Sequence, residues 1–142
     1  MKQLKETYIH PTAVIYPGVK IGTGCYIGAY AVIGAPAEDK GNWLSDDNKS
    51  VVIGDNVIIN GSCTIDAGTC CDTVIENSAF IMKGVHIGHD AIVRQSAVLS
   101  PRVLIGGHSI VGANTNMGMG SIVHQRCEVP HGSMIVTGKH LS

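Results

Sequence analysis

The sequence predicts an all-β fold, a parallel β-helix built from six-residue repeats, because its aliphatic residues recur at every sixth position. The residue four places later is usually small or β-branched, as Ala31 is after Ile27. A glycine often follows the aliphatic residue directly, as Gly28 does, and we expect it to relax the corner of the chain. Nineteen aliphatic positions obey the spacing: Ile9, Ile15, Ile21, Ile27, Ile33, Ile53, Ile59, Ile65, Ile75, Ile81, Ile87, Val93, Leu99, Ile105, Val111, Met117, Val123, Val129 and Ile135.

A period of six suits short strands joined by regular corners, and it fits neither a helix of about 3.6 residues per turn nor one long alternating strand. In such strands the first and fifth positions of the repeat point inward. Three sides close one triangular coil of about eighteen residues, and stacked coils place aliphatic side chains over one another, as in hexapeptide β-helices. A β-sandwich would instead show turns about every 8–12 residues. The nineteen repeats therefore predict a solenoid of about six coils.

The period fails in two places. Residues 35–50 form a polar stretch that contains Pro36 and the only tryptophan, Trp43, and residues 66–74 form a shorter break just before the coil of His86 and His89. Breaks in a solenoid map to loops on one face, and a long loop in a compact repeat usually carries function. We therefore expect a single domain, residues 1–142, with a loop insertion at 35–50 over a substrate cleft. A plain surface excursion is the alternative.

The composition excludes several classes of function. Hydrophobic residues make up 44% of the 142 residues and aromatic residues only 4%, so the core must be aliphatic. The formal net charge of -1 gives no basic field for nucleic acid or for an anionic membrane surface. No apolar run approaches the roughly 20 residues that span a bilayer, and no secretory signal is recognisable. We therefore expect a cytoplasmic protein with no nucleic-acid partner and no membrane span.

The five cysteines are odd in number and show no Cys-x-x-Cys spacing, which argues against a disulfide framework or a zinc ribbon. Cys25, Cys63 and Cys127 occupy the small slot of the repeat, so we expect them to be buried and unpaired, because a free cysteine packs like a small apolar residue. The adjacent Cys70 and Cys71 have no role in this pattern.

The histidines carry the chemistry that the repeat itself does not explain. None of the seven occupies an inward slot. His89 and His108 are nineteen residues apart, one coil plus one residue, and His124 follows His108 by sixteen. We therefore expect three imidazoles to converge along one edge, where they could transfer protons near neutral pH. His10, His131 and His140 fit no such cluster and are expected to be solvated.

Three stretches resemble the acyltransferases of lipid A synthesis: Gly84-Val85-His86-Ile87-Gly88-His89-Asp90, Gly106-Gly107-His108 and Val123-His124-Gln125. With the loop opening Ile33-Gly34-Ala35-Pro36-Ala37-Glu38-Asp39, they are most similar to the UDP-N-acetylglucosamine O-acyltransferases, which use acyl carrier protein thioesters. Thr64-Ile65-Asp66-Ala67-Gly68 is more similar to the UDP-3-O-acylglucosamine N-acyltransferases. The resemblance implies a left-handed parallel β-helix, a homotrimer with the active site between subunits, and no bound cofactor or metal.

The resemblance also implies a role for each matched residue. His89 would be the general base, Asp90 would orient its ring, and the Gly107 N–H would face the thioester oxygen. The sugar or nucleotide-sugar acceptor would contact the remaining matched residues, which are His86, His108, His124, Gln125, Asp39 and Lys40. We expect no C-terminal helical domain, because the chain stops where that domain begins in the O-acyltransferases. The thioester co-substrate is then either acyl carrier protein or CoA, and a short chain such as acetyl fits as well.

Two other functions remain as alternatives. A structural or assembly β-helix without catalysis would share the repeat, but it would give no reason for histidines to converge. A γ-class carbonic anhydrase would share the fold, but Arg94 stands where its second zinc-binding histidine is needed. The sequence leaves open O- against N-acylation, the acyl length and the acceptor.

Overall fold

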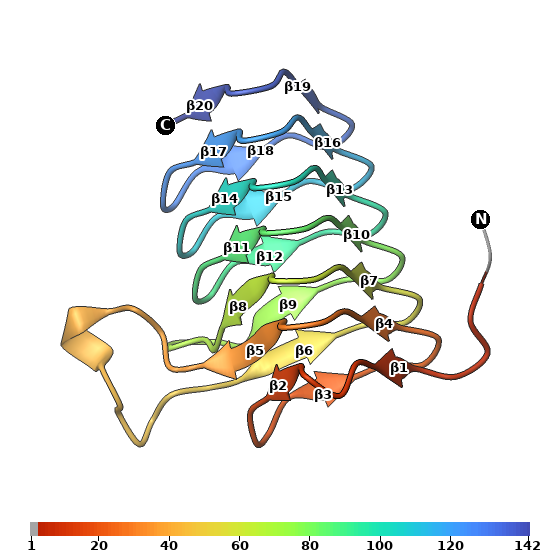
Figure 1. Cartoon of the computed structure of the whole chain (residues 1–142). Coiled ribbons are helices and arrows are strands. Elements are labelled where there is room, and N and C mark those ends of the chain that lie inside the picture. Colours follow the sequence, from red (N-terminus) through yellow and green to blue (C-terminus); the bar gives the residue numbers. More distant parts are fainter. Residues whose placement is uncertain (1–2) are drawn as a thin grey trace.

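The computed structural model describes residues 3–142, which form twenty short strands and one short 3-10 helix (Figure 1). The strands wind into three parallel sheets, in which each strand pairs with the strands three places away in the chain. The first sheet holds β1 (Tyr8–Ile9), β4 (Tyr26–Ile27), β7 (Ile58–Ile59), β10 (Phe80–Ile81), β13 (Val98–Leu99), β16 (Asn116–Met117) and β19 (Met134–Ile135). The second holds β2 (Val14–Ile15), β5 (Val32–Ala35), β8 (Thr64–Asp66), β11 (His86–Ile87), β14 (Leu104–Ile105), β17 (Ile122–Val123) and β20 (His140–Leu141). The third holds β3 (Lys20–Ile21), β6 (Val51–Ile53), β9 (Thr73–Ile75), β12 (Ile92–Val93), β15 (Ile110–Val111) and β18 (Glu128–Val129).

The predicted fold class, an all-β parallel β-helix, is confirmed, but the number of coils differs. Twenty strands at three per coil make nearly seven turns, not six. The repeat continues beyond Ile135 through β20, where Leu141 also packs against the core.

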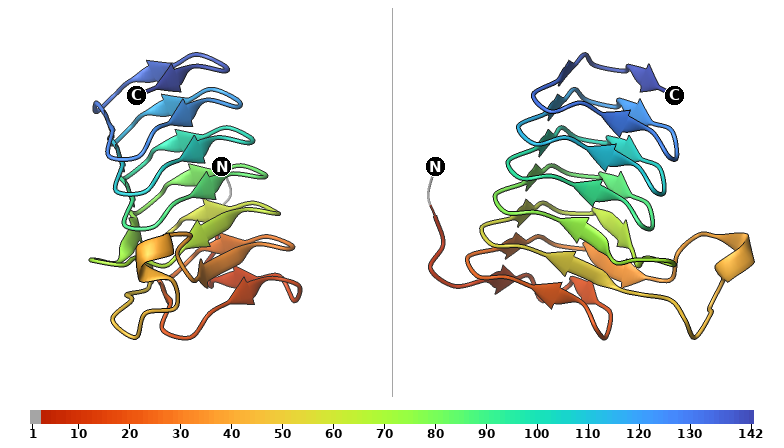
Figure 2. Two further views of the ribbon diagram at one scale, coloured as in Figure 1. Left: turned by 90° about the vertical axis from the view of Figure 1, so that its left-hand side faces the viewer. Right: turned by 180° about the vertical axis from the view of Figure 1, so that it is seen from behind.

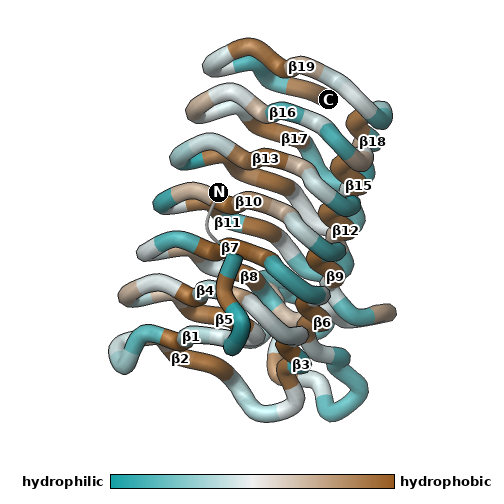
Figure 3. Tube along the Cα trace, turned by 90° about the vertical axis from the view of Figure 1, so that its right-hand side faces the viewer, coloured by the Kyte–Doolittle hydropathy of each residue, from teal (hydrophilic) through white to brown (hydrophobic). Residues whose placement is uncertain are grey.

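The first and fifth positions of the repeat point inward, as predicted. Parallel pairing places Ile27 beside Ile59 and Ile87 beside Ile105, and all four side chains are buried. Apolar segments recur at the same place in successive coils (Figure 3). Each buried aliphatic side chain contributes roughly 1.5–3 kcal/mol. Ile9, in the terminal strand β1, is 42% exposed because it has a neighbouring coil on one side only.

The corners of the coils require a positive φ at the third residue after the aliphatic one. Asp90 (φ 61°) and His108 (φ 60°) occupy this position in neighbouring coils. The glycine directly after the aliphatic residue serves another purpose, since a Cβ on Gly106 would lie 2.5 Å from the Gln125 nitrogen of the next coil. The expectation that this glycine relaxes the corner is therefore wrong at Gly106, where it permits close approach of two backbones.

Both predicted breaks leave the stack at the corner that follows the second sheet. The first runs from the end of β5 to the start of β6, contains the 3-10 helix η1 (Lys40–Asn42), and projects from the solenoid (Figure 2). The second lies between β8 and β9 and is confined to residues 67–72. The two meet, because Lys49 N donates to Gly68 O at 2.9 Å and Ser50 N donates to the Asp72 carboxylate at 2.9 Å.

The cysteine prediction holds for two of three positions. Cys25 and Cys63 are fully buried, but Cys127 is only half-buried, because β18, which follows it, is the last strand of the third sheet. Cys70 and Cys71 are exposed. Within residues 3–142, no helix is long and apolar enough to cross a membrane.

We expect thiol labelling of the native protein to separate the cysteines into three classes. Cys70 should react first, Cys71 and Cys127 more slowly, and Cys25 and Cys63 only after unfolding. The pKa of Cys71 is raised by burial and by the neighbouring Asp90, and burial hides the thiols of Cys25 and Cys63 and raises the pKa of Cys63. Mass spectrometry after timed alkylation measures this order. Equally rapid labelling of all five would contradict the packing described above.

Candidate active site

Two of the three histidines predicted to converge, His89 and His108, meet at the corner that follows the second sheet, whereas His124 directly follows β17 and is exposed. His86 lies in β11, His89 and Asp90 follow β11, and His108 follows β14. A 2.9 Å backbone hydrogen bond from His108 N to His89 O fixes one corner against the next. The sequence separation of nineteen therefore brings the two histidines together, with ring centroids 5.1 Å apart and planes at 90°.

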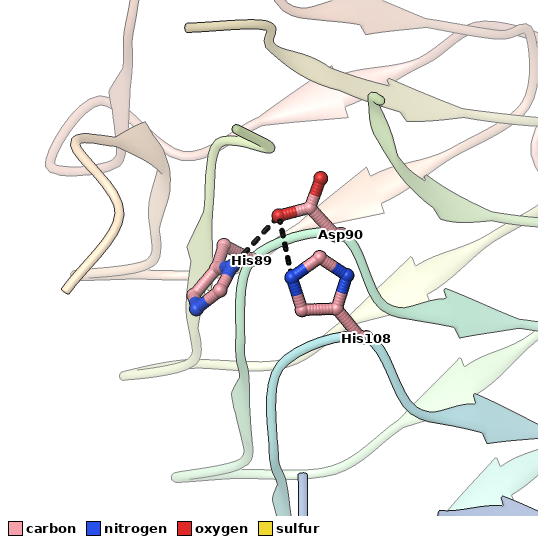
Figure 4. A group of neighbouring side chains, drawn as sticks. All are labelled: His89, Asp90 and His108. Carbon is pink, nitrogen blue, oxygen red and sulfur yellow. Dashed lines mark hydrogen bonds and ion pairs between the residues drawn. The ribbon is translucent and has the colours of Figure 1, made fainter. Parts of the chain in front are cut away.

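Both rings are directed at the carboxylate of Asp90 (Figure 4). His89 Nδ1 lies 2.7 Å from Asp90 Oδ2, and His108 Nε2 lies 3.6 Å from the same oxygen. A carboxylate on Nδ1 fixes the neutral ring as the Nδ1–H tautomer and leaves a lone pair on Nε2. The His89 side chain is 15% exposed, so it is largely buried but still reaches the surface.

Gly107 lies directly against the free side of His89. A Cβ at this position would lie 2.7 Å from His89 Nε2, so only glycine leaves the space in front of that nitrogen open. Within the described part of the chain, the Gly107 N–H donates no hydrogen bond. An unused N–H beside a potential base is the arrangement that an oxyanion donor requires.

Asp90 is buried and almost completely hydrogen-bonded. Burial by itself opposes its charge, but the Cys71 N–H, the His89 ring and the Thr69 side chain and N–H outweigh that effect and hold the pKa of Asp90 well below its ordinary value. The carboxylate is therefore charged at neutral pH and serves as a fixed acceptor for His89.

His86 has a separate set of contacts. Its Nδ1 lies 2.7 Å from Thr64 Oγ1, and its Nε2 lies 3.8 Å from Asp66 Oδ2. Burial raises the pKa of Asp66, and the neighbouring His86 opposes part of that rise. His86 and Asp66 thus form a second polar group on the same face as His89.

Two hollows meet at His86 and Asp66. One, of about 770 Å³, lies under the loop and is lined by Tyr16, Val32, Ala35, Pro36, Glu38, Asp39, Lys40, Trp43, Thr64, Asp66 and His86. The other, of about 510 Å³, is lined by Glu38, Asp66, His86, Gly88, His89, Leu104, Ile105, Gly106, Gly107, Ile122, Val123, His124 and Gln125. Because they share three residues, the hollows form one groove along the second sheet.

The groove brings together most of the predicted site residues. The second hollow is lined by five of them: His86, His89, Gly107, His124 and Gln125. The first hollow is lined by Asp39 and Lys40, and also by His86. His108 lines neither hollow and instead approaches Asp90. Two groups of side chains each bring three potential metal-ligand atoms within 4.8 Å of one another. The groups are His89–Asp90–His108 and Glu38–Asp66–His86.

Sequence reasoning missed the residues that hold Asp90. Thr69, Cys70 and Cys71 surround its carboxylate with hydrogen-bond donors. Glu38 and Asp66, which line both hollows, were also missed as site residues. The only sequence signal for the first group was the break in the repeat just before the histidine coil.

Comparisons with known proteins match the repeat and the fold of this chain. The repeat family described as bacterial transferase hexapeptide (six repeats) matches residues 5–35. A UDP-3-O-acylglucosamine N-acyltransferase of Hahella chejuensis is 36% identical over 81% of this chain, and an acyl-[acyl-carrier-protein]--UDP-N-acetylglucosamine O-acyltransferase of Campylobacter concisus is 29% identical over 87%. The crystal structure of the UDP-N-acetylglucosamine O-acyltransferase of Moraxella catarrhalis matches with a TM-score of 0.77 at 28% identity, covering 94% of this chain and 66% of that one.

The chain spans 34% and 48% of the lengths of the two curated relatives. Over that shared part, the six-residue period, the stacked parallel strands and the matched proteins all indicate a hexapeptide-repeat β-helix. The chain is similar to bacterial transferases with hexapeptide repeats, and the relatives it matches are named as UDP-sugar acyltransferases.

Proposed function

We propose that the protein is an acyltransferase that moves an acyl group from a thioester to a hydroxyl or amine of a sugar or nucleotide sugar. One observation carries the proposal: His89 Nε2 faces Gly107 while the charged Asp90 holds the other ring nitrogen. A potential base and a residue whose N–H is unused therefore lie next to each other. The names of the relatives support the acyl thioester and the UDP-sugar as substrate classes.

In the proposed reaction, His89 Nε2 removes the proton from the acceptor as its oxygen or nitrogen attacks the thioester carbonyl. The Gly107 N–H stabilises the oxyanion, the new acyl bond forms, and the C–S bond breaks. The imidazolium, stabilised by Asp90, then returns the proton to the leaving thiolate. General base catalysis contributes about 10²–10⁴-fold, and one oxyanion donor contributes about 10²–10³-fold.

The groove supplies a binding site of the right kind on either side of the base. The 770 Å³ hollow, which we call the outer hollow, is lined by Trp43, Asp39 and Lys40 and suits the acceptor sugar. Polar groups of the sugar would reach His86, which lines the same hollow. The 510 Å³ hollow, which we call the inner hollow, is lined by His89 together with Leu104, Ile122, His124 and Gln125. It suits the end of an acyl chain or further contacts with the acceptor. Acyl carrier protein and CoA both present the required thioester.

We propose a homotrimer in the cytoplasm. The groove runs along the outer surface of one sheet, and small-molecule sites are more often enclosed at interfaces. A second subunit against this face would close it, as the resemblance to trimeric acyltransferases implies. Five unpaired cysteines suit a reducing compartment.

The alternatives have less support. A purely structural β-helix gives no reason for a buried charged carboxylate aligned on two histidines. In the carbonic anhydrase alternative, the position of the second zinc ligand is Arg94, whose Nη1 lies 2.8 Å from Glu76 Oε2 and is committed to that ion pair.

Replacing His89 with Ala should reduce acyl transfer by about 10²–10⁴-fold, because the general base is lost. The control is His131→Ala, which removes an exposed histidine far along the chain and should leave the rate within twofold. Thioester consumption in the presence of acceptor measures both, and circular dichroism checks that the fold is retained. If His89→Ala keeps more than about a tenth of the rate, the base is not His89.

Light scattering coupled to size exclusion should give about 45 kDa at micromolar concentration, three times the 14.9 kDa of one chain. The physical reason is that the groove is enclosed only when another subunit covers it. A mass near 15 kDa under the conditions of the activity measurement would rule out the trimer.

A further inference from the structure

The short turn between β8 and β9 surrounds the carboxylate of Asp90 with donors. The N–H groups of three consecutive residues, Thr69, Cys70 and Cys71, lie 3.1, 2.8 and 2.9 Å from Asp90 Oδ1. We call residues 69–71 the Asp90-binding turn. Successive N–H groups that converge in this way form an anion-binding concavity.

The two carboxylate oxygens share the Thr69 N–H and otherwise have different partners. Oδ1 accepts only from the Asp90-binding turn, including a longer 3.6 Å contact from the Cys71 thiol. Oδ2 faces the rings of His89 and His108 and also accepts from Thr69 Oγ1 at 2.8 Å and from Thr69 N at 3.0 Å. One oxygen is thus anchored, and the other is presented to the imidazoles.

The turn is held in place independently of Asp90. Gly68 N donates to Ser50 O at 3.1 Å, and Gly68 O accepts from Lys49 N, which ties the turn to the end of the projecting loop. Gly68 must be glycine, because a Cβ there would overlap the carbonyl of Cys71. The donors are therefore in position whether or not a substrate is bound.

We propose that the Asp90-binding turn is a positioning element of the acyltransferase, with Thr69 as its positioning side chain, and that it sets the orientation and charge of Asp90 for His89. This role rests on the proposed function, because it matters only if His89 is a base. The geometry requires no chemistry at Cys70 or Cys71. Burial and the neighbouring Asp90 raise the pKa of Cys71, so its thiol is a weak nucleophile that stays protonated beside the carboxylate.

Thr69→Val tests the proposal, because it keeps the shape and removes the Oγ1 donor to Oδ2, together with a longer 3.7 Å contact from the same hydroxyl to Cys70 Sγ. We expect the pKa of Asp90 to rise, since a hydrogen bond to the charged form is lost, and the His89 Nδ1 resonance to shift, since Oδ2 then accepts one hydrogen bond fewer. Carbon-13 NMR of the Asp90 carboxyl and nitrogen-15 NMR of the His89 ring measure these changes. The acyl-transfer rate should fall about tenfold, because a slightly misplaced base is a poorer base.

Two matched variants separate positioning from general stability. Thr69→Ser restores the hydroxyl and should restore both NMR signatures and the rate. Thr115→Val removes a buried hydroxyl that bonds Pro130 O in another corner, and it should leave both signatures unchanged. Wild-type spectra in Thr69→Val, failure of rescue by Thr69→Ser, or an equal change in Thr115→Val would each overturn the proposal.

A measurement on the wild-type protein covers the case in which Thr69→Val does not fold. The amide protons of Thr69, Cys70 and Cys71 should all shift in one acid transition, the one in which the Asp90 carboxyl itself titrates. Amides that do not follow that transition would overturn the proposal. Because NMR needs neither thioester nor acceptor, a positive result without acyl transfer would reject the proposed function and leave the positioning contact intact.

Discussion

The parallel register between coils is the constraint on which the rest of this structure depends. Each strand pairs with the equivalent strand of the next coil, so Ile87 lies beside Ile105 and His86 beside Leu104. The same register stacks the corners, where Asp90 and His108 both adopt a positive φ and His108 N bonds to His89 O. The stacking of similar aliphatic layers in the core therefore also fixes the relative positions of side chains on the outer surface of the solenoid.

The two interruptions leave this frame almost regular, with one register shift between Ile33 and Ala35 where β5 pairs with β8. Both leave the stack at the corner after the second sheet, and the strands on either side of them pair in the usual order. The longer loop adds a wall with Trp43 and Lys40 to a surface that would otherwise be open. The shorter one turns three N–H groups toward a single carboxylate in the next coil. Regular repeats supply the scaffold, and the shorter departure from it supplies the N–H groups that hold Asp90.

Much of this arrangement could be predicted from the sequence, because a period of six fixes both burial and stacking. The inward positions, the two breaks and the meeting of His89 with His108 follow from spacing alone. The environment of Asp90 could not be predicted, because its donors are backbone N–H groups of Thr69, Cys70 and Cys71, and backbone groups leave no signature in residue type. The spacing also predicted more burial for Cys127 than the structure shows. The spacing does not reveal that the third sheet ends at β18, the strand that follows Cys127.

The most direct test of the account is a crystal structure of the protein with a non-hydrolysable thioether analogue of an acyl-CoA. The account predicts that the analogue lies in the inner hollow with its carbonyl oxygen about 3 Å from the Gly107 nitrogen and its carbonyl carbon in front of His89 Nε2. An analogue bound at full occupancy elsewhere on the solenoid, with the space between His89 and Gly107 filled only by water, would contradict it.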